Sequence, residues 1–127
     1  MTPQGSDPSS RVARLSTRAT RPQESEVLAE YFLVTEIPGP AWDESRPRRE
    51  QDGWDEHATF VDGLANEGVV VFGGPVGDPD FGPALLVFHA ENETEIRRRL
   101  ADDPWMETIL IIEGIQPWSI WVGTPPG

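Results

Sequence analysis

Residues 54–74, WDEHATFVDGLANEGVVVFGG, place a helix pattern directly before a strand pattern, and this succession decides the fold. Apolar residues at helical spacing predict a helix from about Arg48 to Glu67 with one apolar stripe. Gly68 is suited to end that helix in a left-handed conformation, and the run after it, 69–74, reads as a strand. The apolar stripe comprises Trp54, Ala58, Val61, Leu64 and Ala65.

The flanking sequence supplies the remaining elements. EYFLVTE (30–36) is rich in aromatic and β-branched residues and predicts a strand, after which Pro and Gly mark a loop over 37–47. Further patterns predict a strand at 84–90, a helix at 92–103 with Asn92 as its N-cap, and a last strand at 107–123. The order βαββαβ indicates an α+β, ferredoxin-like fold, with a four-stranded antiparallel sheet and both helices on one face.

One folded domain accounts for most of the chain. The 127 residues suffice for a single modest core. Residues 1–28 contain prolines, serines and arginines with little apolar clustering, which predicts a disordered tail. We expect the ferredoxin-like domain to span 29–123 and a short C-terminal tail to follow at 124–127.

The predicted sheet is apolar on both faces. In the strand at 84–90, Leu85 and Val87 alternate with Leu86 and Phe88, so each face receives large apolar side chains. The helices cover one face, and the other needs a partner. We therefore expect a homodimer in which two sheets pack against each other through the uncovered face.

Charge and composition exclude several classes of function. The chain has 22 acidic residues against ten basic ones, a net charge of −12, and every basic residue is an arginine. Such a surface disfavours nucleic acid and anionic membranes. There is no cysteine, and no apolar run approaches the roughly 18 residues of a membrane helix. The expected location is the cytoplasm.

No metal or cofactor site is predicted. The two histidines, His57 and His89, lack HxH or HExxH spacing. The glycine-rich run at 73–82 precedes a strand rather than a helix, so its glycines indicate a turn and not an anion site. Arg97, Arg98 and Arg99 are typical of a solvated helix face, and His89 of a rim or interface position.

His57 and Asp103 are the candidate catalytic pair. His57 shares the sheet-facing side of the first helix, and Asp103 follows the second helix just before Pro104. Because both helices lie on one face in this fold, the two side chains could meet, and a carboxylate would orient the imidazole as a base. A core histidine bonded to a backbone carbonyl is an equally open interpretation of the spacing.

Several motifs together resemble the YCII-related (YciI-like) domain family of the dimeric α+β barrel superfamily. They are HATFVDGLANEG (57–68), FGGP (72–75), Gly82 before a strand, DPW (103–105) and IQPW (115–118). The resemblance covers residues 30–122. It implies a ferredoxin-like dimer with an active-site pair at His57 and Asp103, and with Gly74 and Pro75 along the same pocket. One branch of the family is similar to a dehydrochlorinase of a chlorinated hydroxyquinol, in which such a pair transfers protons.

Two departures from the family pattern bear on the substrate. Trp105 stands where Phe is commoner, and the loop over 37–52 is longer and more acidic than in compact members. Both change the pocket wall, so the resemblance does not specify a substrate. The expected apolar walls of the pocket are Trp54, Phe72, Trp105 and Trp118, which suit an aromatic or quinone-like small molecule.

Three functions follow from these observations. The first is a cofactor-independent enzyme in which His57 acts as base or acid, Asp103 orients it, and elimination or isomerisation follows. The second is a non-catalytic domain that binds a small molecule, and the third is a structural dimer module. An open pocket that contains a bonded His57–Asp103 pair would favour the first.

Overall fold

The computed structural model describes residues 30–124, which contain one four-stranded sheet, two α-helices and a short 3-10 helix. The predicted tail at 1–28 and residues 125–127 of the predicted C-terminal tail lie outside the described residues. The elements in chain order are β3 (Glu30–Pro38), η1 (Arg48–Glu50), α1 (Trp54–Asn66), β4 (Val70–Pro75), β5 (Ala84–Ala90), α2 (Glu93–Leu100) and β6 (Leu110–Trp118).

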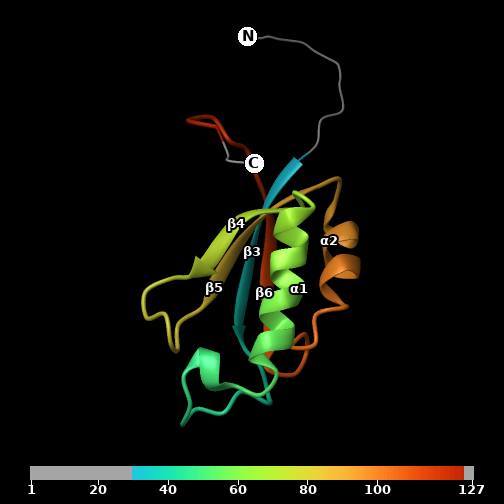
Figure 1. Ribbon diagram of the computed structural model, residues 1–127. Helices are drawn as coiled ribbons and strands as arrows, with labels where there is room; N and C mark the ends of the chain where they lie inside the picture. Colours follow the sequence, from blue (N-terminus) through green and yellow to red (C-terminus); the bar gives the residue numbers. More distant parts are fainter. Residues whose placement is uncertain (1–29, 125–127) are drawn as a thin grey trace, which may run out of the picture.

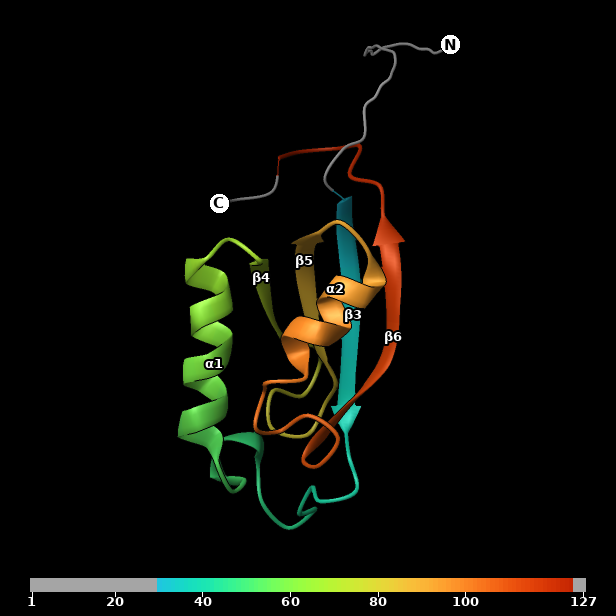
Figure 2. The same cartoon turned by 90° about the vertical axis from the view of Figure 1, so that its right-hand side faces the viewer.

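The sheet has the strand order β4-β5-β3-β6, and every neighbouring pair is antiparallel. β3 lies between β5 and β6, so the first strand of the domain is central. Both helices lie on the same side of the sheet (Figure 1), and α2 crosses in front of the central strands in the rotated view (Figure 2). The predicted α+β, ferredoxin-like βαββαβ fold is confirmed.

The helix predicted over 48–67 is divided in the structure. η1 makes one short turn, and α1 begins only at Trp54 because Gly53 adopts a left-handed conformation with φ of 77°. Such a φ is readily accessible to glycine and strained for other residues. The predicted end is confirmed, since Gly68 has φ of 80° just after the helix.

The other boundaries differ from prediction by a few residues. α2 ends at Leu100, where the chain turns and the amide of Asp103 donates to the Leu100 carbonyl at 3.0 Å. Its predicted N-cap is confirmed, since Oδ1 of Asn92 accepts a bond of 2.8 Å from the Glu95 amide. β6 begins at Leu110 rather than 107 because the chain first closes a loop in which the Glu107 amide donates to the Leu110 carbonyl.

The main core fills the space between the helices and the inner face of the sheet. Alternate residues of β3 and β5 point inward, as the period of two in a strand requires. They pack against Leu64 of α1 and against Ile96 and Leu100 of α2. The buried members are Phe32, Val34, Leu64, Val70, Leu86, Phe88, Ala90, Ile96 and Leu100.

The outer face of the sheet is apolar and is not covered by either helix. A hollow of about 410 Å³ on this face includes Leu33, Leu85 and Val87 among its lining residues. Phe72 and Trp118 flank it and remain 51% and 43% exposed. None of the helices within residues 30–124 has the length and apolar character needed to cross a membrane.

Candidate active site

His57 and Asp103 lie 46 positions apart in the sequence and form a buried hydrogen-bonded pair. Nδ1 of His57 is 2.9 Å from both Oδ1 and Oδ2 of Asp103. The histidine is 8% exposed and the aspartate 3%. The ring is therefore held by a side-chain carboxylate rather than by a backbone carbonyl, which decides between the two interpretations that the spacing left open.

The first turn of α1 positions the histidine. Gly53 is the residue before the helix, and its carbonyl accepts the hydrogen bond of 3.0 Å from the His57 amide. A Cβ at Gly53 would lie 3.3 Å from Nε1 of Trp105, so the glycine also leaves room for that ring. The histidine thus projects from a rigid helical turn, which fixes its direction better than a loop would.

The turn after α2 positions the aspartate. Oδ1 of Asp103 accepts a bond of 2.8 Å from the Trp105 amide, and the Asp103 carbonyl accepts one of 2.9 Å from the Met106 amide. The carboxylate therefore receives one backbone donor in addition to the histidine. A buried carboxylate needs such donors because desolvation otherwise disfavours its charge.

Trp105 supports the imidazole from one side. Its indole stacks on the His57 ring with centroids 4.1 Å apart and planes 8° from parallel. Nε1 of the indole donates to the Asp52 carbonyl at 2.6 Å, which ties the ring to the segment just before α1. Trp105 is 1% exposed, so it forms the floor of the site.

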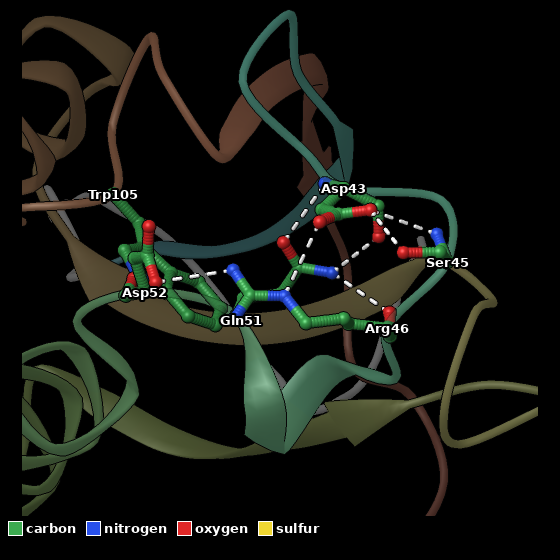
Figure 3. Close-up of polar contacts among 6 residues, drawn as sticks. All are labelled: Asp43, Ser45, Arg46, Gln51, Asp52 and Trp105. Atoms are coloured by element: carbon green, nitrogen blue, oxygen red, sulfur yellow. Dashed lines mark hydrogen bonds and ion pairs between the residues drawn. The ribbon is translucent and has the colours of Figure 1, made fainter.

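The acidic loop before α1 is ordered by side-chain to backbone hydrogen bonds (Figure 3). Gln51, which is 3% exposed, accepts from the Asp43 amide at 2.9 Å and donates to the carbonyls of Asp43 and Arg46 at 2.8 Å each. The hydroxyl and amide of Ser45 hold the pKa of Asp43 below its usual range. The segment 43–51 is therefore held in a defined conformation by its own side chains.

A cavity of about 400 Å³ opens beside the histidine. Within residues 30–124 no hydrogen bond is made to Nε2 of His57, so this is the ring nitrogen available to a molecule in the cavity. The size of the cavity is that of a site for a small organic molecule. The lining consists of Glu36, Arg48, Arg49, Trp54, His57, Ala58, Val61, Asp62, Gly73, Gly74, Pro75, Ala84, Leu86 and Leu110.

The structure brings some of the predicted pocket residues together and separates others. Trp54, Gly74 and Pro75 line the cavity beside His57, and Trp105 stacks beneath the ring instead of lining it.

Phe72 and Trp118 line the hollow on the outer face of the sheet and do not reach this cavity. His89 is exposed on that same outer face, where its ring stacks on Tyr31 with centroids 5.0 Å apart.

Glu36 is a cavity residue that the sequence analysis missed. It is only 2% exposed, and its Oε2 is buried without a hydrogen-bond partner among residues 30–124. Burial raises the pKa of this carboxyl to about 7, with the charge of Asp103 adding to the effect and that of Arg48 opposing it. A signal was present, because Glu36 continues the inward-facing alternation of Phe32 and Val34.

Arg48 is the buried cation of the same cavity. Its guanidinium donates to the carbonyls of Pro79 and Gly82, and it lies 5.4 Å from the centroid of the Trp42 ring. Burial lowers its pKa from the ordinary value, while the charge of Glu36 opposes that shift. Arg48 therefore fastens the loop at 79–82 to the cavity wall and carries a positive charge on this side.

Comparisons with protein-family models, with curated proteins and with solved structures find no match. Membership in the YCII-related family therefore stays a prediction, carried by the motifs quoted above. Residues 30–124 contain no group of three or more His, Cys, Asp or Glu side chains that could hold a metal ion.

Proposed function

We propose that this protein is a cofactor-independent enzyme that transfers protons on a small organic molecule, in an elimination or an isomerisation. One observation supports this more than any other. Nδ1 of His57 is held by both carboxylate oxygens of Asp103, while Nε2 is left available to a cavity. A base, an orienting acid and a space for the reacting molecule are the components that general acid–base catalysis requires.

The role of each residue follows from the hydrogen bonding. When Nδ1–H donates to Asp103, the neutral ring carries its lone pair on Nε2. Nε2 of His57 then takes a proton from a carbon of the bound molecule, and Asp103 stabilises the imidazolium that results. The stacked Trp105 keeps the ring in place during this transfer.

The cavity wall supports a flat, partly apolar substrate. Trp54, Val61, Leu86 and Leu110 supply apolar surface, and Arg48 and Arg49 supply positive charge. A small aromatic or quinone-like molecule with an electronegative substituent would match both parts.

A screen for ligands followed by a screen for turnover tests the proposal. Thermal-shift measurements on a panel of small aromatic and carbonyl compounds select binders, because a ligand stabilises only the state that binds it. Each binder is then incubated in D₂O and followed by proton NMR. We expect His57→Ala to lower any exchange or conversion by about 10² to 10⁴-fold, the usual contribution of a general base.

The matched control is Glu56→Ala, which changes the exposed neighbour of His57 on the same helix. Full turnover by the His57→Ala variant would contradict the proposed mechanism. Tight binding by the wild-type protein without exchange or conversion of any binder would instead identify a non-catalytic binding domain.

We also propose that two copies of the chain pair through the outer face of the sheet. A cytoplasmic location and membership in the YCII-related family are part of the same proposal. The support is the apolar hollow that includes Leu33, Leu85 and Val87, which neither helix covers. Light scattering should give the mass of a dimer, and Leu85→Glu should give that of a monomer, because a buried unpaired charge opposes association. A monomeric wild-type protein would contradict this pairing.

A further inference from the structure

Glu36 is the feature of the cavity that the His57–Asp103 pair does not explain. It lies near the end of β3, with its Cα opposite Ala84 of β5 and Ile112 of β6, so its immediate neighbours across the sheet are apolar. It nevertheless lines the cavity that contains His57. A carboxyl that is 2% exposed on the inward face of a central strand requires a physical reason.

The contacts of Glu36 are not those of a structural carboxylate. The nearest buried cation, Arg48, donates its hydrogen bonds to the Pro79 and Gly82 carbonyls and forms no ion pair with it. Oε2 of Glu36 has no partner within residues 30–124. A buried structural carboxylate normally has such partners, as Asp103 does with the histidine and the Trp105 amide. The same carboxyl in its neutral form is far less costly to bury.

We propose that Glu36 is a second catalytic residue of this cavity, a neutral carboxyl that donates a proton to an oxygen of the substrate while His57 removes one from carbon. This inference rests on the proposed function and narrows it. The substrates it implies have a carbonyl group and an acidic C–H bond on the adjacent carbon. Of the two proposed reactions, it favours isomerisation through an enol.

The step balances without any further reactant. The C–H bond beside the carbonyl breaks, its proton goes to Nε2 of His57, and its electron pair forms a C=C bond. The π pair of the carbonyl takes the proton of the Glu36 O–H, which gives a neutral enol, a Glu36 carboxylate and an imidazolium. In a β,γ-unsaturated ketone the enol is conjugated with the second C=C bond. Return of the imidazolium proton to the γ-carbon, with the two C=C π pairs shifting by one bond each and the C=O bond re-forming as the enol proton returns to Glu36, yields the conjugated ketone and restores both residues.

The electrostatics of the site agree with a proton donor near neutral pH. Burial raises the pKa of Glu36 to about 7, and the charge of Asp103 acts in the same direction. Arg48 opposes the shift, and the other ionisable groups that line the cavity are Arg49, His57 and Asp62. An acid whose pKa lies near the working pH is well suited to donate and regain a proton.

The first test uses a β,γ-unsaturated cyclohexenone, whose conversion to the conjugated isomer is followed by its ultraviolet absorbance. Glu36→Gln keeps the shape of the side chain and removes the transferable proton, so we expect kcat/KM to fall about a hundredfold. The wild-type rate should also fall as pH rises through about 7, and the variant should lack that decline. Glu56→Gln is the matched control on an exposed glutamate.

The outcomes separate the two proposals. If His57→Ala is inactive while Glu36→Gln stays within about twofold of wild type with the same pH profile, Glu36 is not catalytic and the proposed function stands. If His57→Ala retains full activity, the proposed function fails, and the role of Glu36 that rests on it fails as well.

A second measurement does not depend on turnover. Phenol serves as a stable mimic of the enol, and the ¹³C resonance of the Glu36 carboxyl, assigned by comparison with Glu36→Gln, reports contact with its hydroxyl. We expect the resonance to titrate near pH 7 and to shift when phenol binds, and phenol binding to weaken severalfold in the variant. A carboxyl that titrates like that of a solvent-exposed glutamate, or that does not respond to bound phenol, would overturn the assignment.

Discussion

The two ends of the helix-covered face of the sheet are built from the same elements but from different chemistry. On β3, Phe32 and Val34 face an apolar core, and two residues further on Glu36 faces a cavity. On α1, Leu64 is packed in that core, and two turns earlier His57 bonds to a carboxylate. One end is filled with hydrocarbon, whereas the other holds ionisable groups around an open space.

The difference separates stability from chemistry within one layer. At the apolar end, burial is favourable because it removes hydrocarbon from water. At the polar end, burial raises the pKa of Glu36 and lowers that of Arg48, so both shifts favour the neutral form. The folded state therefore bears a cost for holding these two side chains charged. We infer that burial of hydrocarbon at the apolar end offsets the cost of burying Glu36 and Arg48 at the polar end.

Truncation at the apolar end should give the largest loss of stability. Phe88 of β5 is fully buried, and Phe88→Ala leaves a cavity that costs about 3–5 kcal/mol of the free energy of unfolding. Urea unfolding measures this loss. The downfield proton resonance of His57 Nδ1–H should persist in the folded variant, because no hydrogen bond joins Phe88 to His57 or Asp103. Loss of that resonance would show that the two ends are one cooperative unit.

Glu36→Gln should give a smaller effect that depends on pH. The pKa of Glu36 is raised from 4.5 to about 7 in the folded state, so the folded protein holds its proton more tightly than the unfolded chain. Stability from this group is therefore present below pH 4.5 and is lost as pH rises to about 7. At 1.36 kcal/mol per pKa unit, the total change is about 3 kcal/mol.

The measurement compares the free energies of unfolding of wild type and Glu36→Gln between pH 4 and pH 8, about the range set by the pKa shift. The difference between the two curves should move in favour of the variant as pH rises. A constant difference would mean that Glu36 titrates as it does in the unfolded chain, and the contrast between the two ends would lose its electrostatic basis.

The fold could be predicted from local patterns because each element carries its own signal. Aromatic and β-branched runs identified the four strands, helical spacing and capping signals identified the two helices, and Asn92 and Gly68 marked two helix ends correctly. The break at Gly53 was missed, because residues 48–53 are all polar or glycine and carry no apolar periodicity that would show where the helix begins. The extended backbone of Gln51 and the left-handed φ of Gly53 separate η1 from α1.

The site could be predicted only where fold geometry alone brings residues together. Two helices on one face of the sheet made a contact between His57 and Asp103 possible, and the resemblance to the YCII-related family singled out that pair. Phe72 was assigned to the pocket, but a β-bulge between Val70 and Phe72 shifts the register and turns Phe72 to the outer face. Glu36 was missed because its burial depends on residues far from it in the sequence, such as His57 and Leu110, which line the same cavity.

Trp105→Phe tests the smallest expected effect, at the boundary of the polar end. The substitution brings in the residue that is commoner in the resembled family and removes the Nε1 bond to the Asp52 carbonyl. Loss of this one hydrogen bond should lower the free energy of unfolding by about 1 kcal/mol. The Trp105 amide bond to Asp103 is a backbone bond and is retained, so the Nδ1–H resonance of His57 should remain. If the resonance disappears instead, the indole tether to Asp52, and not only the carboxylate, holds the imidazole, and the long acidic loop becomes part of the site itself.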